Sequence, residues 1–359
     1  PKQKGLLFAG TEREVYFTSN DGASWQSLRL NMPASSIRDL VIHDNDLVIG
    51  THGRSIWILD DFSPLREINN INTNKSHLFQ PSNAFRVRYN MFSDTPLPPE
   101  EPTGQNPPDG ALIDYYLDSN ANKVNLEIVD LKGNKVNWFS SDDVEEFIDS
   151  TSMQHPTYWI RPFKKLSTKN GHQRFVWNLR YKEPRGANRG YDIAAVQYNT
   201  ESGPVGPFVA PGEYKIKLSV DGKSMEHIIK VKLDPRSEMS ADALNLQSTL
   251  SLQCYNNYET LQVIRESIDK KLADKDGSKN ELQKFRGSGE PNNGDIIYGS
   301  IYASELKDET IVGLQSKLLY LLTVLQNADE MPTAKTQEAA SMLDKRVVEM
   351  TQLWDSLKK

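Results

Sequence analysis

The sequence contains a single cysteine, Cys254, which excludes an internal disulfide and a zinc site built from cysteine ligands. Its surroundings form a leucine-rich helical pattern, so we expect a small buried side chain rather than a reactive thiol. The six histidines are scattered and never stand two or four residues apart, as the ligands of a local metal site would. From these absences we expect no metal and no cofactor.

Long apolar runs and clusters of positive charge are missing as well. No apolar run approaches the ~20 residues that a membrane-spanning helix needs, so no membrane span is expected. The 42 lysines and arginines are outnumbered by 48 acidic residues, and no basic block stands out. A nucleic-acid binder needs clustered lysine and arginine to neutralise phosphates, so no nucleic-acid partner is expected.

The sequence does contain enough apolar material for several cores. Hydrophobic residues make up 37% of the 359 residues, which excludes wholesale disorder. The length favours two to three domains. Because β-type and helical patterns occupy separate stretches, the predicted fold class is multidomain β plus α.

Residues 1–62 carry six short β-type runs separated by tight turns, such as the one at residues 20–22. This spacing predicts antiparallel strands joined by hairpins. Residues 63–110 are polar and then rich in proline, which predicts a linker followed by a stiff, exposed loop. We expect residues 77–92 within this stretch to join the domain that follows.

Residues 111–236 return to a β pattern with wider spacing. About seven half-apolar runs fill this length, which predicts an Ig-like β-sandwich. Phe175, Trp177 and Leu179 alternate with polar neighbours, so we expect Trp177 in the core of this sandwich. Residues 140–170 do not continue the pattern and are interpreted as an insertion, acidic first and then aromatic and basic.

From residue 237 to residue 359 the apolar period changes from 2 to 3.6, which predicts three helices in an antiparallel bundle. Ser240 is the expected N-cap of the first helix, and Thr333 that of the last. The apolar positions of the second and third helices follow heptad steps. They are Ile311, Leu314, Leu318, Leu321 and Leu325, and then Leu343, Val347, Met350, Trp354 and Leu357.

The most specific local motif is Thr18-Ser19-Asn20-Asp21-Gly22-Ala23-Ser24-Trp25. It resembles the Asp-box of bacterial neuraminidase repeats, whose pattern is S/T-x-D-x-G-x-S/T-W. The defined positions are Thr18, Asn20, Gly22, Ser24 and Trp25, with asparagine in place of the usual aspartate. Asn20 can bond to its own loop, Gly22 can take a positive φ, and Trp25 can anchor the hairpin in the blade core. The resemblance implies a structural role at the rim of a propeller blade.

Residues 50–61 resemble the last blade of a large group of bacterial proteins with sortilin-like β-propellers, often labelled glycosyl hydrolase. The resemblance continues over residues 106–117 and 174–181, in the Ig-like domain of that group, and reaches its helical tail. It implies that residues 1–62 are two incomplete propeller blades and that further blades precede them. It also implies a signal peptide upstream, an extracytoplasmic location (periplasmic, cell surface or secreted) and the upstream propeller portion as a partner.

His52, Arg54, Asp60 and Asp61 are the first group of candidate binding residues. They form the densest polar cluster of the blade-like region. Arg54 could bind an anion, and the two aspartates could bind a cation or sugar hydroxyls. Turn residues that hydrogen-bond to the linker are the alternative interpretation.

Tyr158 and Trp159, together with Trp138, are the second candidate group. They could form a platform on which a sugar ring stacks. Buried aromatic side chains between two sheets are the alternative, and they are the commoner arrangement.

Two functions compete at this point. The first is a non-catalytic structural and interaction region of a secreted or surface propeller protein that binds protein or glycan partners. The second is part of a sialidase-like glycoside hydrolase whose active site lies mostly in upstream blades. Such an enzyme needs an arginine cluster, a nucleophile pair and an acid, and the sequence carries no recognisable set of them. We therefore favour the non-catalytic function and assign no catalytic residue.

Overall fold

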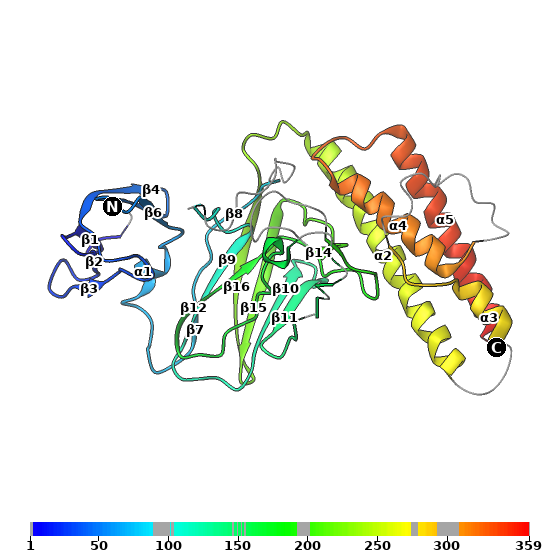
Figure 1. The fold of residues 1–359 in the computed structure, drawn as a ribbon, viewed down its shortest axis with the longest axis horizontal. Helices are drawn as coiled ribbons and strands as arrows, with labels where there is room; N and C mark the ends of the chain where they lie inside the picture. The colour runs from blue at the N-terminus through cyan, green and yellow to red at the C-terminus, as the bar shows by residue number, and fades with distance from the viewer. Residues whose placement is uncertain are drawn as a thin grey trace.

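A computed structural model describes residues 3–88, 101, 104–145, 147–148, 150–151, 153, 156–191, 202–273, 279–292 and 309–358. The chain combines β-sheets with α-helices, as predicted. Figure 1 shows three parts that follow one another along the chain: small sheets at the N-terminal end, larger sheets in the middle and helices at the C-terminal end. Most of the predicted proline-rich loop at 93–110 lies outside the described residues.

Two three-stranded antiparallel sheets form the N-terminal part, with the orders β1-β2-β3 and β4-β5-β6. Their strands are β1 (Leu7–Gly10), β2 (Val15–Thr18), β3 (Gln26–Ser27), β4 (Ile37–His43), β5 (Asp46–Thr51) and β6 (Ile56–Leu59). Each of the six β-type runs in the sequence is therefore a strand. Asp21 and Asp44 take the positive φ angles that two of the tight turns between these strands require.

The two small sheets share one core. Val15 and Phe17 of β2 are buried in it together with Leu47 and Ile49 of β5. Alternate residues of a strand point to opposite faces of a sheet, so each pair presents one apolar face to the other sheet. Phe62, from the segment that leaves β6, completes this core.

The middle part consists of two sheets, one with the order β11-β10-β15-β16-β8 and one with the order β12-β9-β7. All their strand pairs are antiparallel except β16 with β8, which is parallel. A short helix, α1 (Pro64–Glu67), precedes them. The strands are β7 (His77–Leu78), β8 (Ala84–Arg86), β9 (Ala111–Leu117), β10 (Val124–Asp130), β11 (Lys135–Ser140), β12 (Gly171–Trp177), β15 (Gly212–Val220) and β16 (Lys223–Leu233). A separate pair joins β13 (Gly190–Tyr191) to β14 (Ser202–Gly203).

Trp177 belongs to the core that the two middle sheets share. Its side chain is fully buried, as predicted, and its ring lies edge-on to Tyr214 with the centroids 5.9 Å apart. The indole Nε1 donates a hydrogen bond to the carbonyl oxygen of Arg180 at 3.0 Å, so the polar atom of this buried ring is satisfied. Within residues 140–170, the structure describes one turn of 3₁₀-helix, η1 (Thr157–Trp159).

Helices make up the C-terminal part. They are α2 (Ala241–Ala273), α3 (Lys279–Arg286), α4 (Ile311–Gln326) and α5 (Ala334–Leu357). The three long ones, α2, α4 and α5, pack around one core, and the short α3 is an element that the sequence analysis did not predict. Ser240 accepts a hydrogen bond from the backbone N–H of Ala243, and Thr333 accepts one from that of Thr336. Both predicted N-caps are therefore confirmed.

The predicted apolar positions of α4 and α5 are buried with one exception. The buried ones are Ile311, Leu314, Leu318, Leu321 and Leu325 in α4, and Leu343, Val347, Met350 and Trp354 in α5. Leu357 is exposed, contrary to prediction, since it is the last residue of α5. Cys254 is buried in the same core, and burial raises the pKa of its thiol to about 12, so the thiol stays protonated at neutral pH.

A buried group of charges fixes the helices to the middle sheets. Arg86, at the end of β8, is 1% exposed, and both Arg86 and Arg88 donate to the same carboxylate oxygen of Asp329, at 2.7 and 2.8 Å. Arg88 also donates to the carbonyl oxygen of Gln326 at the end of α4, where the helix dipole favours a cation. Asp329 lies between α4 and α5, so this contact holds their connection against β8.

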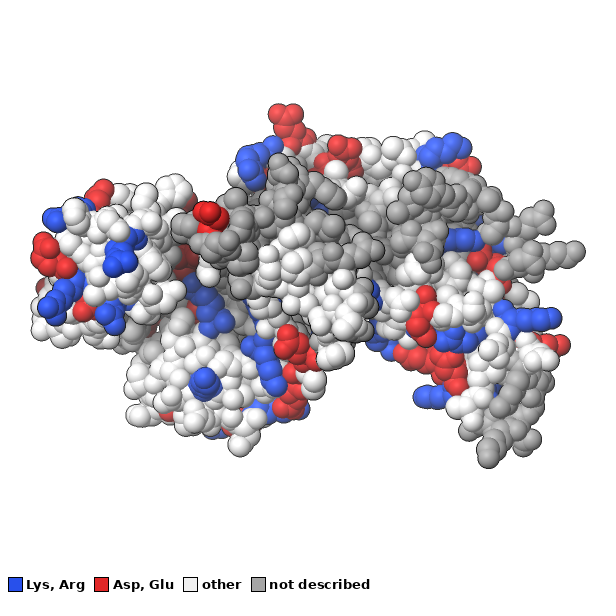
Figure 2. Space-filling model, in the orientation of Figure 1, with Lys and Arg blue, Asp and Glu red and all other residues white. Residues whose placement is uncertain are grey.

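The surface carries both signs of charge. Lysine and arginine side chains are interspersed with aspartate and glutamate on the face that Figure 2 shows. None of the helices in the described residues is long and apolar enough to cross a membrane.

The buried position of Trp177 generates a prediction about stability. Trp177→Ala should lower the free energy of unfolding of the middle part by about 3–5 kcal/mol, because it removes a large ring from a filled core. Denaturant unfolding of the purified chain measures this loss. Trp25→Ala is the matched control, since the Trp25 ring is 43% exposed and its loss should cost much less. An unfolding midpoint of Trp177→Ala equal to that of the wild type would contradict the placement.

The helical core generates a second prediction. Leu318→Asp should unfold the helices, because it places an unpaired carboxylate among the buried side chains of α2, α4 and α5. Val324→Asp, at an exposed position of the same helix, should leave them folded. Far-ultraviolet circular dichroism during thermal unfolding measures both. Full helicity and cooperative unfolding of Leu318→Asp would show that this side of α4 faces solvent or another protein.

Candidate functional site

The turn between β2 and β3 contains the residues of the Asp-box-like motif, joined by hydrogen bonds. The Thr18 hydroxyl donates to the Asn20 side-chain oxygen at 2.8 Å and accepts from the Gly22 backbone N–H at 3.1 Å. The Asn20 amide nitrogen donates to the Ser24 hydroxyl at 2.9 Å, a bond that an aspartate could not donate. Gly22 has a φ of 90°, as its role in the turn requires. The asparagine thus keeps the acceptor of the motif and adds a donor.

Trp25 occupies a different place from the one the motif predicts. Its side chain is 43% exposed and does not enter the core of the two small sheets. The ring lies over Gly22 instead, where a Cβ on the glycine would stand 3.7 Å from it. Because β3 begins at Gln26, Trp25 precedes the strand and covers the turn rather than the sheet.

His52, Arg54, Asp60 and Asp61 do not form one cluster. The first two lie in the turn between β5 and β6 and are exposed, whereas the two aspartates follow the end of β6. The four residues of β6 separate the two pairs by about 13 Å along the strand. The predicted polar cluster is therefore wrong, because residues close in sequence stand at opposite ends of an extended segment.

Asp60 and Asp61 take part in a contact between the small sheets and the middle part. Arg174 of β12 donates to their two carbonyl oxygens at 2.6 and 2.7 Å. The same guanidinium donates to both carboxylate oxygens of the buried Asp114 at 2.9 and 3.0 Å, and His172 lies 2.8 Å from one of them. Burial by itself would raise the pKa of Asp114, but its hydrogen bonds from His172 and Arg174 outweigh burial and lower it.

The side chains of the two aspartates differ in their surroundings. Burial, together with the charges of Asp46 and Asp61, raises the pKa of Asp60. Asp61 accepts a hydrogen bond on its carboxylate from the backbone N–H of Ser63 at 3.1 Å, and its own N–H donates to Asp46 at 2.8 Å. These bonds shape the chain as it leaves β6, which agrees with the turn-and-linker interpretation. The described residues contain no group of three His, Cys, Asp or Glu side chains that could hold a metal ion.

Tyr158 and Trp159 lie in η1, with their rings perpendicular and the centroids 6.3 Å apart. Both side chains are half-buried, and neither belongs to the core that the two middle sheets share. Trp138 lies on β11, where its ring neighbours are Lys135 and Lys182. Trp138 thus comes from a strand, whereas Tyr158 and Trp159 come from the 3₁₀-helix.

The outer face of the β4-β5-β6 sheet exposes a group of aliphatic side chains. Val41, Val48 and Ile58 lie in register across its three strands, and the first and last of them are 51% and 57% exposed. Ile56, on the same face of β6, is 72% exposed. In the part of the chain that the structure describes, β6 pairs only with β5, so its other edge is open. Contiguous apolar surface beside an open strand edge is typical of an interaction site.

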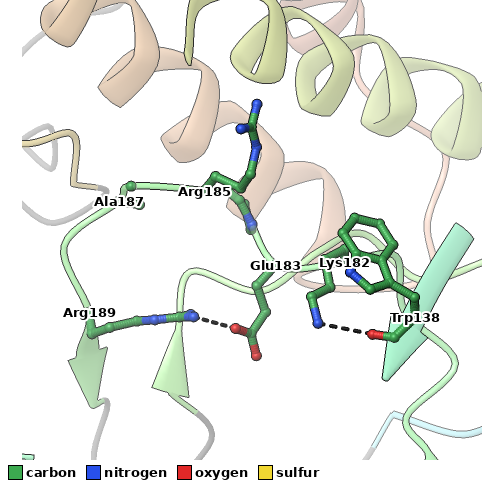
Figure 3. A pocket seen from close by; sticks show the side chains of 8 residues that line it. Trp138, Lys182, Glu183, Arg185, Ala187 and Arg189 are labelled. Carbon is green, nitrogen blue, oxygen red and sulfur yellow. Dashed lines mark hydrogen bonds and ion pairs between the residues drawn. The ribbon is translucent and has the colours of Figure 1, made fainter. Parts of the chain in front are cut away.

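A pocket of about 310 Å³ lies beside β11, lined by Trp138 and by seven residues of the segment 182–189. Figure 3 shows Trp138 and Lys182 on one side of it, with Glu183 and Arg189 paired on the other and Arg185 pointing toward the helices. The pocket therefore combines one large aromatic ring with charged groups of both signs.

The segment that lines the pocket is held on both sides. The N–H of Lys182 donates to the Val136 carbonyl oxygen at 3.0 Å, which ties its start to β11. Arg185 pairs with Glu259 and Glu266 of α2, at 2.7 and 3.0 Å. These contacts connect the pocket wall to elements that lie far away in the sequence.

Lys182 differs electrostatically from the two arginines of the pocket. Arg189 pairs with Glu183, and Arg185 with two glutamates of α2. The contacts of the Lys182 ammonium in the described residues are the carbonyl oxygen of Trp138, at 3.0 Å, and the rings of Trp138 and Phe139. The contacts that the structure describes for the Lys182 ammonium are thus all with uncharged groups.

Sequence reasoning missed this pocket. Trp138 was considered with two other aromatics, but the segment 182–189 carries no motif. Its one local signal is the density of charge in Lys182, Glu183, Arg185 and Arg189, which alone is typical of a solvated loop.

Compared with models of known protein families, the chain matches none, and no curated protein matches its sequence. The resemblance to sortilin-like propellers accordingly depends on the sequence motifs alone.

The Arg174 contact generates a prediction. Arg174→Met should lower the free energy of unfolding by about 3–5 kcal/mol, because it leaves the buried Asp114 carboxylate without its guanidinium partner. Arg236→Met, which removes an exposed guanidinium from Asp234, should leave stability nearly unchanged. Urea unfolding at neutral pH measures both variants, and equal stability of the two would contradict a role for Arg174.

The same contact predicts a pH dependence. Because the pKa of Asp114 is lowered in the folded chain, its stabilising contribution is present above the ordinary value of about 3.9 and is lost as the pH falls through the lower, folded value. Arg174→Met lacks the guanidinium that lowers this pKa, so its free energy of unfolding should fall less than that of the wild type as the pH is lowered through the folded pKa of Asp114. Urea unfolding at a series of pH values measures the difference.

Proposed function

We propose that the chain is a non-catalytic structural and interaction region of a secreted or cell-surface β-propeller protein. In this proposal β1–β3 and β4–β6 are two incomplete blades, the two middle sheets form an Ig-like sandwich, and α2, α4 and α5 form an antiparallel three-helix bundle. The two small three-stranded sheets and the hydrogen-bonded turn between β2 and β3 support the propeller assignment. The single core within each part supports the division into domains.

The observation that carries the proposal is the outer face of the β4-β5-β6 sheet. An isolated small sheet that exposes aliphatic side chains and a strand edge is marginal in water. Val41, Ile56 and Ile58 are more than half exposed, whereas Leu47 and Ile49, on the opposite face of the same sheet, are buried in the core that the two small sheets share. A second β-sheet is the occupant that fits, because it offers both an apolar face and a strand edge. We infer that a further propeller blade of the same protein covers this surface.

The extracytoplasmic location belongs to the same proposal and depends on the propeller resemblance. Protein and glycan partners beyond the propeller itself are compatible with an interaction region. The alternative, a sialidase-like glycoside hydrolase, gains no support from the first group of candidate binding residues. His52 and Arg54 stand apart from Asp60 and Asp61, whose carbonyl oxygens are taken up by Arg174.

The proposal predicts how charge on the open face will act. Val41→Lys and Ile58→Lys, singly or together, should change the free energy of unfolding by no more than about 0.5 kcal/mol each, as expected for exposed positions. They should also reduce self-association of the 359-residue chain, because charged side chains disfavour sheet-to-sheet contact. Ile49→Lys, on the buried face of the same sheet, is the control that should prevent folding of this part.

Hydrogen exchange separates docking from simple exposure. Alternate backbone amides of Ile56–Leu59 face β5, and the others point to the open edge. The amides at the open edge should exchange quickly in the 359-residue chain, and slowly in any longer natural form of the protein in which a blade covers β6. Light scattering measures self-association of the lysine variants, and denaturant unfolding measures their stability. Equal exchange in the two forms, or strong destabilisation by Ile58→Lys, would contradict the proposal.

A further inference from the structure

The pocket beside β11 has a chemistry that the proposed docking function does not use. Its lining comes from β11 and from a segment that contacts α2, whereas the open apolar face belongs to β4–β6, which Figure 1 shows in the N-terminal part. Its volume, about 310 Å³, is at the small end of the range in which ligand pockets fall. We propose that this pocket binds a saccharide unit that carries a carboxylate, such as a uronic acid.

Trp138 supplies the surface for the sugar ring. Its side chain is 42% exposed, although it lies on a strand of the five-stranded sheet. The ammonium groups of Lys135 and Lys182 lie 5.3 and 5.2 Å from the ring centroid. A half-exposed indole still presents apolar surface that the C–H face of a pyranose ring can cover.

Lys182 supplies the preference for a carboxylate. Its ammonium donates to the carbonyl oxygen of Trp138, at 3.0 Å, and so it stands next to the ring on which the sugar would stack. The two arginines of the pocket are neutralised by glutamates, whereas the described contacts of Lys182 are uncharged. A carboxylate on the ligand would give this ammonium a charged partner at the wall of a concave site.

The remaining polar groups suit hydroxyl groups. Glu183 and Arg189 pair with each other and offer acceptors and donors side by side, which is the combination that vicinal hydroxyls can bridge (Figure 3). Beside Trp138, the apolar lining consists of Pro184 and Ala187 only. Such walls favour a hydroxylated ligand over an apolar peptide side chain.

The pocket is also preformed. Gly186 has a φ of 64°, and a Cβ there would collide with the guanidinium of Arg265, which donates to the Gly186 carbonyl oxygen at 2.6 Å. The hydroxyl of Tyr258 donates to the carbonyl oxygen of Arg185 at 2.8 Å. Because the wall is fixed by α2, little entropy of ordering is lost when a ligand enters.

Saturation-transfer NMR and calorimetric titration of the 359-residue chain test the proposal with three probes. Methyl glucuronide is the acidic sugar, methyl glucoside is its neutral counterpart, and acetate carries the charge without the ring. We expect methyl glucuronide to bind at least about tenfold more tightly than either of the others. Equal affinities for acetate and methyl glucuronide would mean that the pocket binds the carboxylate without recognising the sugar ring. Equal affinities for the two sugars would mean that the carboxylate does not contribute to binding. Either result overturns the proposal, as does the absence of binding by all three.

Variants locate the site. Lys182→Met should remove the preference for the acidic sugar, and Lys182→Arg should retain it, because the arginine keeps the charge. Trp138→Ala should weaken the binding of both sugars by about tenfold or more. Lys217→Met, at an exposed position of β15, is the matched control and should bind as the wild type does. Circular dichroism confirms folding, and if Trp138→Ala is unfolded the Lys182 variants decide. Unchanged selectivity in Lys182→Met would overturn the proposal and leave the docking function of the β4-β5-β6 face untouched.

Discussion

Buried guanidinium–carboxylate pairs determine how the three parts of this chain are joined. Arg174 connects the segment after β6 to the buried Asp114, and Arg86 connects the end of β8 to Asp329 beyond α4. A buried charge is costly unless it is paired, so each contact favours one arrangement of the parts it joins. The parts themselves have separate apolar cores. Stability within each part thus comes from apolar burial, whereas the directional contacts between parts are largely polar.

Periodicity explains why so much of the fold could be predicted. The alternation around Trp177 and the heptad steps around Leu318 each place one face of an element in a core, and those faces are buried. The N-caps at Ser240 and Thr333 could also be predicted, because a serine or threonine directly before a helical apolar pattern commonly caps that helix. The helix α3 and the exposure of Leu357 were missed, since propensity and period say little about short helices and about the last turn of a long one.

The candidate sites were much harder to predict, for a physical reason. His52 and Asp60 are eight residues apart in sequence, but an extended strand between them carries them away from each other. Conversely, Arg185 owes its position to Glu259, which follows 74 residues later on α2. No local sequence pattern predicts such a contact, because it depends on how a helix packs against a loop of the middle part. The aromatic ring of Trp138 was visible in the sequence, whereas the charged wall opposite it was not.

The two surfaces identified on this chain should respond differently to solution conditions, because their chemistry differs. Contact through the β4-β5-β6 face would bury aliphatic side chains, and the free energy of such burial depends little on moderate salt. Recognition by Lys182 would depend on charge at a half-buried site, and salt would weaken it in part. The apolar face lies in the N-terminal part, and the pocket lies where the middle sheets meet α2. The two sites share no residue and no strand, so a partner that covers the β4-β5-β6 face does not have to occupy the pocket. A chain built in this way can be anchored through its small sheets while its pocket stays accessible to a separate ligand.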